Sequence, residues 1–250
     1  MRVVPRTGSM NSISVIIPTR GRPHFLKQAL ASVLAQGHAP KEIIVVDDGV
    51  GAAEAVGNMH PLIRVLDNAE RGPVPARNMG VAHASGAFIC FLDDDDWFTD
   101  EGYFEMAAAA FKGGADFIYA DGTLAFEDGR ASLPFAFHAD AGTLTRDNTI
   151  LISGVLYRRS LHAELGPFDE TLPYYWDWDW YLRVARAGHG LTHIQRPVVA
   201  IRVHARNMSG DSLEAPRRAN LDRFSTKHGL SPLPLKNHLD IATGATGKQT

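Results

Sequence analysis

The stretch FICFLDDDDWF, Phe88 to Phe98, decides how the rest of the sequence is interpreted. An apolar run of strand length ends in four consecutive aspartates, Asp93 to Asp96, and two aromatic residues follow at once. Adjacent carboxylates repel one another, so a positive partner is expected where the strand ends. Because hard divalent cations take carboxylate oxygens as ligands, the pattern predicts a metal site at Asp93 and Asp95. A helix cap would explain one of the aspartates but not all four.

Short runs of β-branched residues alternate with helical patterns around this stretch. Strands are expected at 13–17, 42–46, 62–66, 87–92 and 116–120, and helices at 25–36, 75–84 and 100–111. The strand runs are apolar on both faces and are separated by helices. They therefore predict an α/β fold with a mostly parallel central sheet, flanked by helices on both sides.

Polar residues gather where the predicted strands end. These clusters are Pro18, Thr19 and Arg20 after the first strand, Asp47 and Asp48 after the second, and Asp93 to Asp96 after the fourth. Ligands in such sheets bind beyond the carboxyl ends of the strands. The three clusters therefore predict one site at one edge of the sheet.

The pattern changes after residue 121. A hairpin is expected at 123–137, an extended segment at 150–159, a helix at 177–188, a strand at 198–204 and a helix at 215–229. No linker separates the two parts, so we predict one domain with two halves, 12–121 and a smaller 122–230. Residues 1–11 are interpreted as an N-terminal extension or tag. Residues 231–250 are interpreted as a C-terminal tail, with about the last ten residues disordered.

Composition excludes several classes of function. The net charge is −3 without a basic block, which argues against nucleic-acid binding. No apolar segment approaches the roughly 20 residues of a transmembrane helix, so a cytoplasmic protein is expected. Arg217, Arg218 and Arg223 are interpreted as a solvated helix face, with contact to a membrane surface as the alternative. The single cysteine, Cys90, lies in an apolar run and predicts a buried thiol.

The pair Asp47-Asp48 admits several interpretations. A response-regulator receiver would carry its paired acids after the first strand, and the dehalogenase pattern fails because Trp97 and Phe98 stand where Thr or Val is needed. Neither a P-loop nor a dinucleotide-binding glycine motif is present. We interpret the pair as hydrogen-bond acceptors for a nucleoside, with a polar turn as the alternative.

A further acidic cluster lies in YYWDWDWYLR, residues 174–183, where two aspartates alternate with three tryptophans. One interpretation makes Asp177 a catalytic base in a wall of Trp176 and Trp178 that stacks on sugar rings. The other makes Asp177 the N-cap of a helix, with Trp178 and Tyr181 in the core. The two interpretations are compatible. His138 lies in the segment expected to face an acceptor, and its role stays open.

Several motifs in order resemble the family 2 glycosyltransferases, inverting enzymes of the GT-A fold, over roughly residues 13–210. They are SVIIPTRGRPHFLKQALASVLAQ, EIIVVDDG, RGPVPARNMGVAHASGAFICFLDDDDWF, LGPFDETLPYYWDWDWYLRVARAG and IRVHARNMS. The resemblance implies a nucleotide-sugar donor, usually UDP-linked, and Mn²⁺ or Mg²⁺. It makes 12–121 the nucleotide-sugar-binding half and 122–230 the acceptor-binding and catalytic half.

The resemblance also implies a role for each matching residue. The nucleotide-sugar would contact Pro18, Thr19, Arg20, Arg22, Asp47, Asp48, Asp93 and Asp94, and Arg77 would hold its diphosphate. Asp93 and Asp95 would form the D-x-D pair at the metal, with His204 as a late contact. Asp177 would be the general base, taking the proton of an acceptor hydroxyl that attacks from the opposite face of the sugar.

Four departures from the family pattern suggest an unusual donor or acceptor. They are Arg20-Gly21-Arg22 for Tyr-Asn-Arg, Val50 for Ser or Thr, Trp176 for the acid before the base, and Ile201 for Tyr. The hypothesis is a hexosyl- or N-acetylhexosaminyl-transferase acting on a small molecule, an oligosaccharide or a lipid-linked acceptor. A non-catalytic nucleotide- or sugar-binding relative and a nucleotidyltransferase are the alternatives.

Overall fold

The structure is a computed structural model that describes residues 12–49, 51, 56–69, 71–204 and 213–244. The first half contains every strand and helix that the sequence predicts, and the strand predicted at 116–120 is the beginning of a longer strand, β6 (Phe117–Phe126). The others are β1 (Ile13–Thr19), α1 (Pro23–Leu34), β2 (Glu42–Asp47), β3 (Ile63–Asp67), α2 (Pro73–His83), β4 (Phe88–Phe91) and α3 (Tyr103–Lys112). Pro23 and Pro73 each stand in the first turn of their helix, where a missing N–H costs no hydrogen bond.

These strands run parallel, as predicted. β1 pairs with β2 and β4, and β2 pairs with β3, so the carboxyl ends of all four meet at one edge. β3 is the edge strand, and Arg64, Val65 and Asp67 are exposed. The expectation that every strand is buried on both faces is therefore wrong for β3, which lies at the edge of the sheet, because α2 packs on β1 and β2.

The remaining elements extend the same sheet. They are β5 (Trp97–Phe98) in the first half, β6 (Phe117–Phe126), which runs from the first half into the second, and then β7 (Leu133–Phe135), η2 (Thr143–Thr145), β8 (Leu156–Arg158), α4 (Ser160–Leu165), α5 (Trp176–Arg186), β9 (Leu191–Val203), α6 (Glu214–His228) and α7 (His238–Thr243). The strand order is β3-β2-β1-β4-β8-β6-β9-β5, with β7 beside β6. β6 and β7 form the predicted hairpin. The sheet mixes directions here, because β8 is antiparallel to β4 and β6, whereas β9 is parallel to β6.

The predicted extended segment 150–159 is strand only at 156–158. Ile150 and Leu151 are buried, but they belong to a connecting segment between η2 and β8. Gly154 ends any extension before β8, because its φ of +91° is a left-handed value that a strand does not contain.

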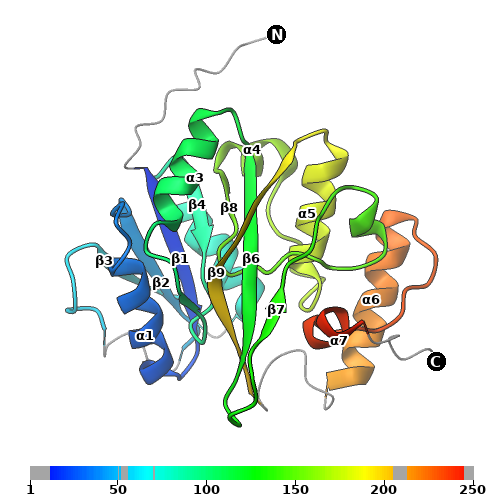
Figure 1. The fold of residues 1–250 in the computed structure, drawn as a ribbon, viewed down its shortest axis with the longest axis horizontal. Coiled ribbons are helices and arrows are strands. Elements are labelled where there is room, and N and C mark those ends of the chain that lie inside the picture. The colour runs from blue at the N-terminus through cyan, green and yellow to red at the C-terminus, as the bar shows by residue number, and fades with distance from the viewer. Residues whose placement is uncertain (1–11, 50, 52–55, 70, 205–212, 245–250) are drawn as a thin grey trace.

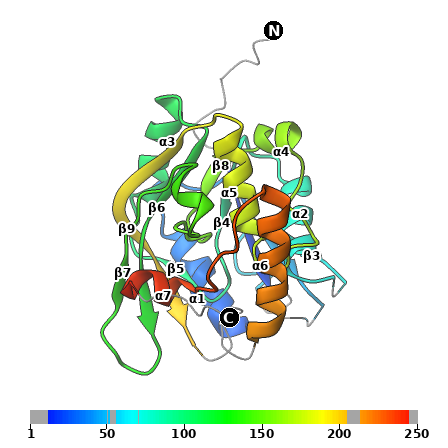
Figure 2. The ribbon, with the colours of Figure 1, turned by 90° about the vertical axis from the view of Figure 1, so that its right-hand side faces the viewer.

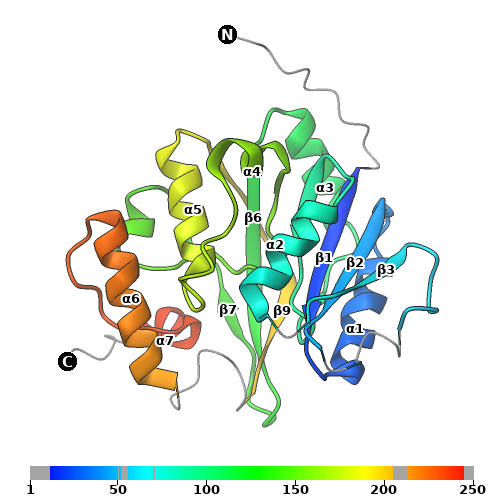
Figure 3. The ribbon, with the colours of Figure 1, turned by 180° about the vertical axis from the view of Figure 1, so that it is seen from behind.

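Helices cover both faces of the sheet. α1 and α3 lie over one face (Figure 1), and α2 and α5 lie over the other (Figure 3). Two hydrophobic clusters result, one beneath each helical layer. Cys90 is completely buried in the α1–α3 cluster, and burial raises the pKa of its thiol far above the ordinary value, as expected for an inert side chain.

The end of the described chain folds against this body. α6 lies beside α5, and α7 lies near β7 (Figure 2). The prediction of disorder is wrong for residues 241–243, because α7 begins with a capping box between Asn237 and Asp240. The solvated face predicted on α6 is wrong for Arg217, which is buried and donates to the carbonyl of Lys236. No helix among the described residues is long and apolar enough to span a membrane.

Candidate active site

The four aspartates form a turn directly after β4, at the edge where the parallel strands end. Asp94 is completely buried, Asp95 and Asp96 are nearly so, and Asp93 is partly exposed. One carboxylate oxygen from each of Asp93, Asp95 and Asp96 lies within 4.8 Å of the other two. Asp93 and Asp95, which the sequence predicted as a metal-binding pair, thus lie close together, and Asp96 lies beside them.

Three basic side chains surround this turn. Arg22, just before α1, pairs with Asp94 and places its Nη1 2.5 Å from Oδ2 of Asp95. Arg77 on α2 forms an ion pair with Asp93. Beyond β9, Nε2 of His204 lies 3.1 Å from the same Oδ2 of Asp95. The positive charge that the sequence required is thus supplied at least in part by the protein.

Asp94 faces inward rather than toward the other acids. Oγ1 of Thr19 donates to its Oδ2 over 2.7 Å, and Arg22 contacts both of its oxygens. Burial raises the pKa of Asp94 to about 6, and the charge of Arg22 opposes this increase. These hydrogen bonds connect the end of β1 to the acidic turn, so Asp94 helps to hold the turn in place.

Asp96 is held by two groups that the sequence did not suggest. Its Oδ2 accepts from Oγ of Ser153 over 2.5 Å, and its Oδ1 accepts from the backbone N–H of Arg202 over 3.0 Å. Burial, followed by the charges of Asp95 and Asp93, raises the pKa of Asp96 well above the ordinary value. Either oxygen can still present a second lone pair to the space shared with Asp93 and Asp95.

Arg202 supports the turn from the β9 side. Its guanidinium carbon lies 4.3 Å from the ring centre of Phe25 and 4.7 Å from that of Trp97, and its Nε donates to the carbonyl of Asp95 over 3.0 Å. Phe25 in turn stacks on the ring of His204 at 5.8 Å. The only sequence signal for this role was the place of Arg202 two residues before His204.

The donor set of this cluster fits a divalent cation. Carboxylate oxygens from three residues converge, which suits Mg²⁺ and Mn²⁺ alike. His204 adds an imidazole nitrogen beside Asp95, and such a ligand suits a transition metal better than it suits Mg²⁺.

The predicted nucleoside residues lie at the ends of β1 and β2. Asp48 is tied into the protein, because its Oδ1 accepts from Nδ2 of Asn68 and from the N–H of Gly72. Pro18 is buried, and Arg20 is exposed with its Nη1 3.4 Å from Asp48. Asp47 lines a surface hollow beside the end of β3, together with Gly49, Gly51, Gly57, Asn58, Val65 and Asp67.

Asp177 lies in the first turn of α5. The N-cap is Tyr175, so the interpretation of Asp177 as the cap is wrong, and its side chain is free to face inward. It is 8% exposed, and its Oδ2 accepts from Nδ2 of Asn148 over 3.0 Å. Burial raises the pKa of Asp177 to about 6, while hydrogen bonds from Asn148 and from the backbone N–H of Trp178 and the charge of Arg77 oppose the increase.

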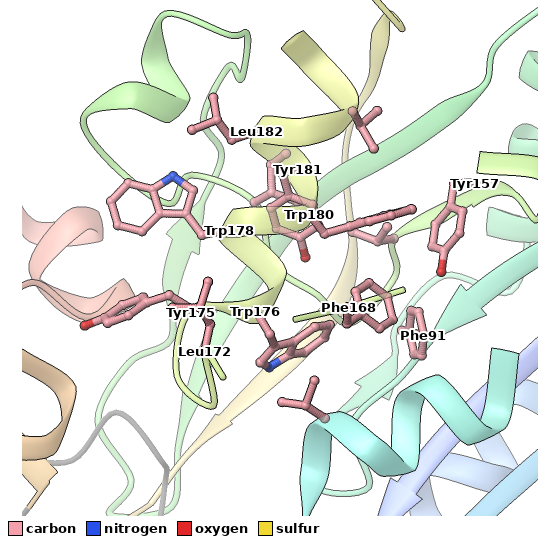
Figure 4. Packing of buried hydrophobic residues seen from close by; sticks show 14 of the residues in the cluster. Phe91, Tyr157, Phe168, Leu172, Tyr175, Trp176, Trp178, Trp180, Tyr181 and Leu182 are labelled. Carbon is pink, nitrogen blue, oxygen red and sulfur yellow. The ribbon is translucent and has the colours of Figure 1, made fainter. Parts of the chain in front are cut away.

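The tryptophans around Asp177 are packed inside the protein (Figure 4). Trp176 lies beneath Arg77, whose guanidinium carbon is 4.5 Å from the ring centre. Trp178 points away from Trp176. Its ring stacks on Phe224 at 4.5 Å, and its Nε1 donates to the carbonyl of Leu144. The predicted aromatic wall open to a sugar is therefore wrong for these rings, because their faces are already covered by side chains.

Arg77 connects the two groups of acids. Its guanidinium contacts Asp93 on one side and covers Trp176, the neighbour of Asp177, on the other. His138 takes no part in this arrangement, since it is exposed and lies 3.7 Å from Asp140. The structure therefore brings the acidic turn, Arg77 and the α5 aspartate together and leaves His138 at the surface.

Comparison with known proteins agrees with this arrangement. A sequence profile of Glycosyl transferase family 2 matches residues 14–162. The chain is 38% identical over 239 residues to the uncharacterized glycosyltransferase YwdF of Bacillus subtilis (strain 168), covering 90% of this chain and 87% of that protein.

The fold is similar to two solved structures. One is S. aureus TarS 1–349 in complex with UDP-GlcNAc, with a TM-score of 0.67, 18% identity and coverage of 94% of this chain and 71% of that chain. The other is the mannosyltransferase PcManGT from Pyrobaculum calidifontis in complex with GDP-Man and Mn²⁺, with a TM-score of 0.64, 17% identity and coverage of 89% and 66%. Together with the profile and the similarity to YwdF, these findings show that the chain is a glycosyltransferase of the GT-A fold and belongs to glycosyl transferase family 2.

Proposed function

We propose that the chain is a metal-dependent inverting glycosyltransferase that moves a sugar from a UDP-linked donor to an acceptor hydroxyl. The observation that carries this proposal is the position of Arg77 between Asp93 of the acidic turn and the first turn of α5, where Asp177 lies. An inverting transfer needs a diphosphate site and a base on opposite sides of the reacting carbon, and this arrangement supports a role of Arg77 in the first and of Asp177 as the second.

Asp93, Asp95 and His204 would hold Mn²⁺ or Mg²⁺, which when bound neutralises charge on the departing diphosphate. Arg77 would exchange part of its contact with Asp93 for a diphosphate oxygen, since a guanidinium binds phosphate and carboxylate in the same geometry. Trp176 keeps the guanidinium plane in place from below. Arg77 would therefore orient the donor, because its guanidinium group is already held in one position.

Asp177 would act as the general base. Its raised pKa of about 6 makes it a stronger base than an ordinary aspartate, yet leaves it ionised at pH 7. It would take the proton of the acceptor hydroxyl while that oxygen attacks the anomeric carbon and the bond to the diphosphate breaks. Attack from the side opposite the leaving group inverts the configuration.

The nucleoside would lie against Pro18, Thr19 and Asp47, where the strands end. The hollow beside Asp47 supports a role in binding the nucleobase, because the buried carboxylate of Asp47 can accept a hydrogen bond from the N–H of uracil. Arg20 and Asp48 would border this region from the loops.

Calorimetric titration with UDP, dTDP, GDP and CMP, each with and without Mn²⁺, tests the donor and metal assignments together. We expect tight binding of UDP only when Mn²⁺ is present, and loss of that dependence in Asp95→Asn. Asp128→Asn is the matched control, because Asp128 is an exposed acid on the β6–β7 hairpin that pairs with Arg130. Equal binding of UDP with and without metal would contradict the metal site. Unimpaired sugar transfer by Asp177→Asn would contradict the role of Asp177 as the general base.

A further inference from the structure

The segment between η2 and β8 contacts both parts of the site. Near its beginning, Nδ2 of Asn148 donates to Oδ2 of Asp177 over 3.0 Å. Near its end, Oγ of Ser153 accepts from the N–H of Asp93 over 3.0 Å and donates to Asp96. One short stretch of chain therefore touches the α5 aspartate and the acidic turn. No motif in the sequence marked either residue.

The segment is held firmly in place. Ile150 is completely buried, and the N–H of Gly154 donates to the carbonyl of Phe91 at the end of β4. On the other side, Nζ of Lys236 lies 2.8 Å from Oδ1 of Asp147, which adjoins Asn148. Asn148 is thus anchored on both sides, and its amide group can hold the Asp177 carboxylate in one orientation.

We propose that Asn148 is a positioning residue that orients the carboxylate of Asp177 for proton abstraction. This inference rests on the proposed role of Asp177 as the base. Oδ1 of Asn148 is buried and has no hydrogen-bond partner among the described residues, so its contact with Asp177 is the hydrogen bond that directs the amide. By occupying Oδ2 with one donor, the amide limits rotation of the carboxylate.

A neutral donor suits this task. An amide N–H stabilises the ionised carboxylate less than a lysine or arginine would, so it restrains the group with a smaller loss of basicity. The other groups that act on Asp177 are the backbone N–H groups of Trp178 and of Asp177 itself, Arg77 from α2, and the hydroxyls of Tyr175 and Tyr181 from α5. Of these, Arg77 carries a charge, and it also faces Asp93.

Carboxyl ¹³C NMR of the full chain, labelled at the aspartate carboxyl carbon, tests this proposal without substrate. The Asp177 signal is assigned by its loss in Asp177→Asn and titrated between pH 4 and 9. In Asn148→Ala, loss of the donor should raise the pKa of Asp177 by about one unit, a tenfold change in its acid constant. In Asn148→Asp, the added like charge should raise it further.

Thr149→Val is the matched control. Thr149 is the buried neighbour of Asn148, the exchange is nearly isosteric, and its Oγ1 has no hydrogen-bond partner among the described residues. The control should leave the pKa of Asp177 unchanged, and thermal unfolding confirms that each variant folds.

An unchanged pKa of Asp177 in both Asn148 variants would overturn the inference, as would an equal shift in Thr149→Val. Neither result depends on catalysis. If the pKa moves as expected but Asp177→Asn still transfers sugar, the proposed base is wrong while the contact itself stands. If Asp177→Asn is inactive but the pKa does not move, only the role of Asn148 fails.

Discussion

Asp177 illustrates the cost of a buried base at the scale of a single residue. Burial raises its pKa from 3.8 to about 6, because the folded protein solvates the negative charge less well than water does. The folded state therefore binds this proton more tightly than the unfolded state. Its contribution to stability is fully present below pH 4 and is lost as the pH rises through about 6.

Replacing Asp177 with Asn should consequently stabilise the protein at neutral pH while abolishing transfer. A shift of about two pKa units corresponds to about 3 kcal/mol in the free energy of unfolding at pH 7, an upper estimate that should vanish near pH 4. Urea unfolding of wild type and variant at pH 4, 5.5 and 7 measures it. Asp128→Asn, at an exposed acid, should show no such gain. A variant less stable than wild type at pH 7 would contradict the argument.

At the scale of an element, α2 sets the position of Arg77 through its contact with β1. Gly80 faces Ile16, and a Cβ on it would lie 2.5 Å from Cγ2 of that isoleucine. The absence of a side chain lets the helix lie close to the sheet. Arg77 is one helical turn before Gly80, so the distance of α2 from the sheet also decides whether the guanidinium reaches Asp93.

Gly80→Ala should therefore destabilise the protein and weaken donor binding. Overpacking of this kind typically costs about 1–3 kcal/mol in the free energy of unfolding, despite the better helix propensity of Ala. Urea unfolding and UDP calorimetry with Mn²⁺ measure the two effects. Gly190→Ala is the matched control, because a Cβ there meets nothing within 4 Å. Equal stability of the two variants would show that α2 can move without cost.

At the scale of the whole molecule, the two halves share one sheet and both hydrophobic clusters. β4 of the first half pairs with β8 of the second, and β5 pairs with β9. The cluster beneath α5 contains Ile16 from β1, and the cluster beneath α1 contains Val199 from β9. If either half unfolded alone, buried apolar residues of the other half would become exposed to water.

We therefore expect the halves to unfold together in one transition. Cys90 reports on the first half through the reactivity of its buried thiol, and in Trp97→Phe the remaining tryptophans report on α5 by fluorescence. Both signals, measured in that variant against urea concentration, should have the same midpoint and should coincide with the far-UV circular dichroism transition. Two separated midpoints would mean that 12–121 and 122–230 are independent folding units.

Several contacts of the site could be found only in the folded structure, because they join residues far apart in the sequence. Ser153 lies in the segment predicted to be extended and Asn148 lies just before it, and nothing local shows that their side chains reach Asp96 and Asp177. The aromatic wall predicted at Trp176 and Trp178 was wrong for a related reason, whereas the alternative that places Trp178 and Tyr181 in the core is confirmed. An exposed aromatic wall and a buried aromatic core have the same sequence pattern, and only the packing of Phe224 and Arg77 against the rings distinguishes them.

By itself the sequence determined three things: the order of strands and helices in the first half, the convergence of the acidic clusters at one sheet edge, and the family. These depend on local apolar periodicity and on motifs read along the chain. Only the tertiary structure decided which charges face each other. Asp94 turned inward to Arg22, Arg77 came to lie between Asp93 and Trp176, and Asn148 reached Asp177. Such pairings join residues far apart in sequence, and they are set by the packing of helices on the sheet.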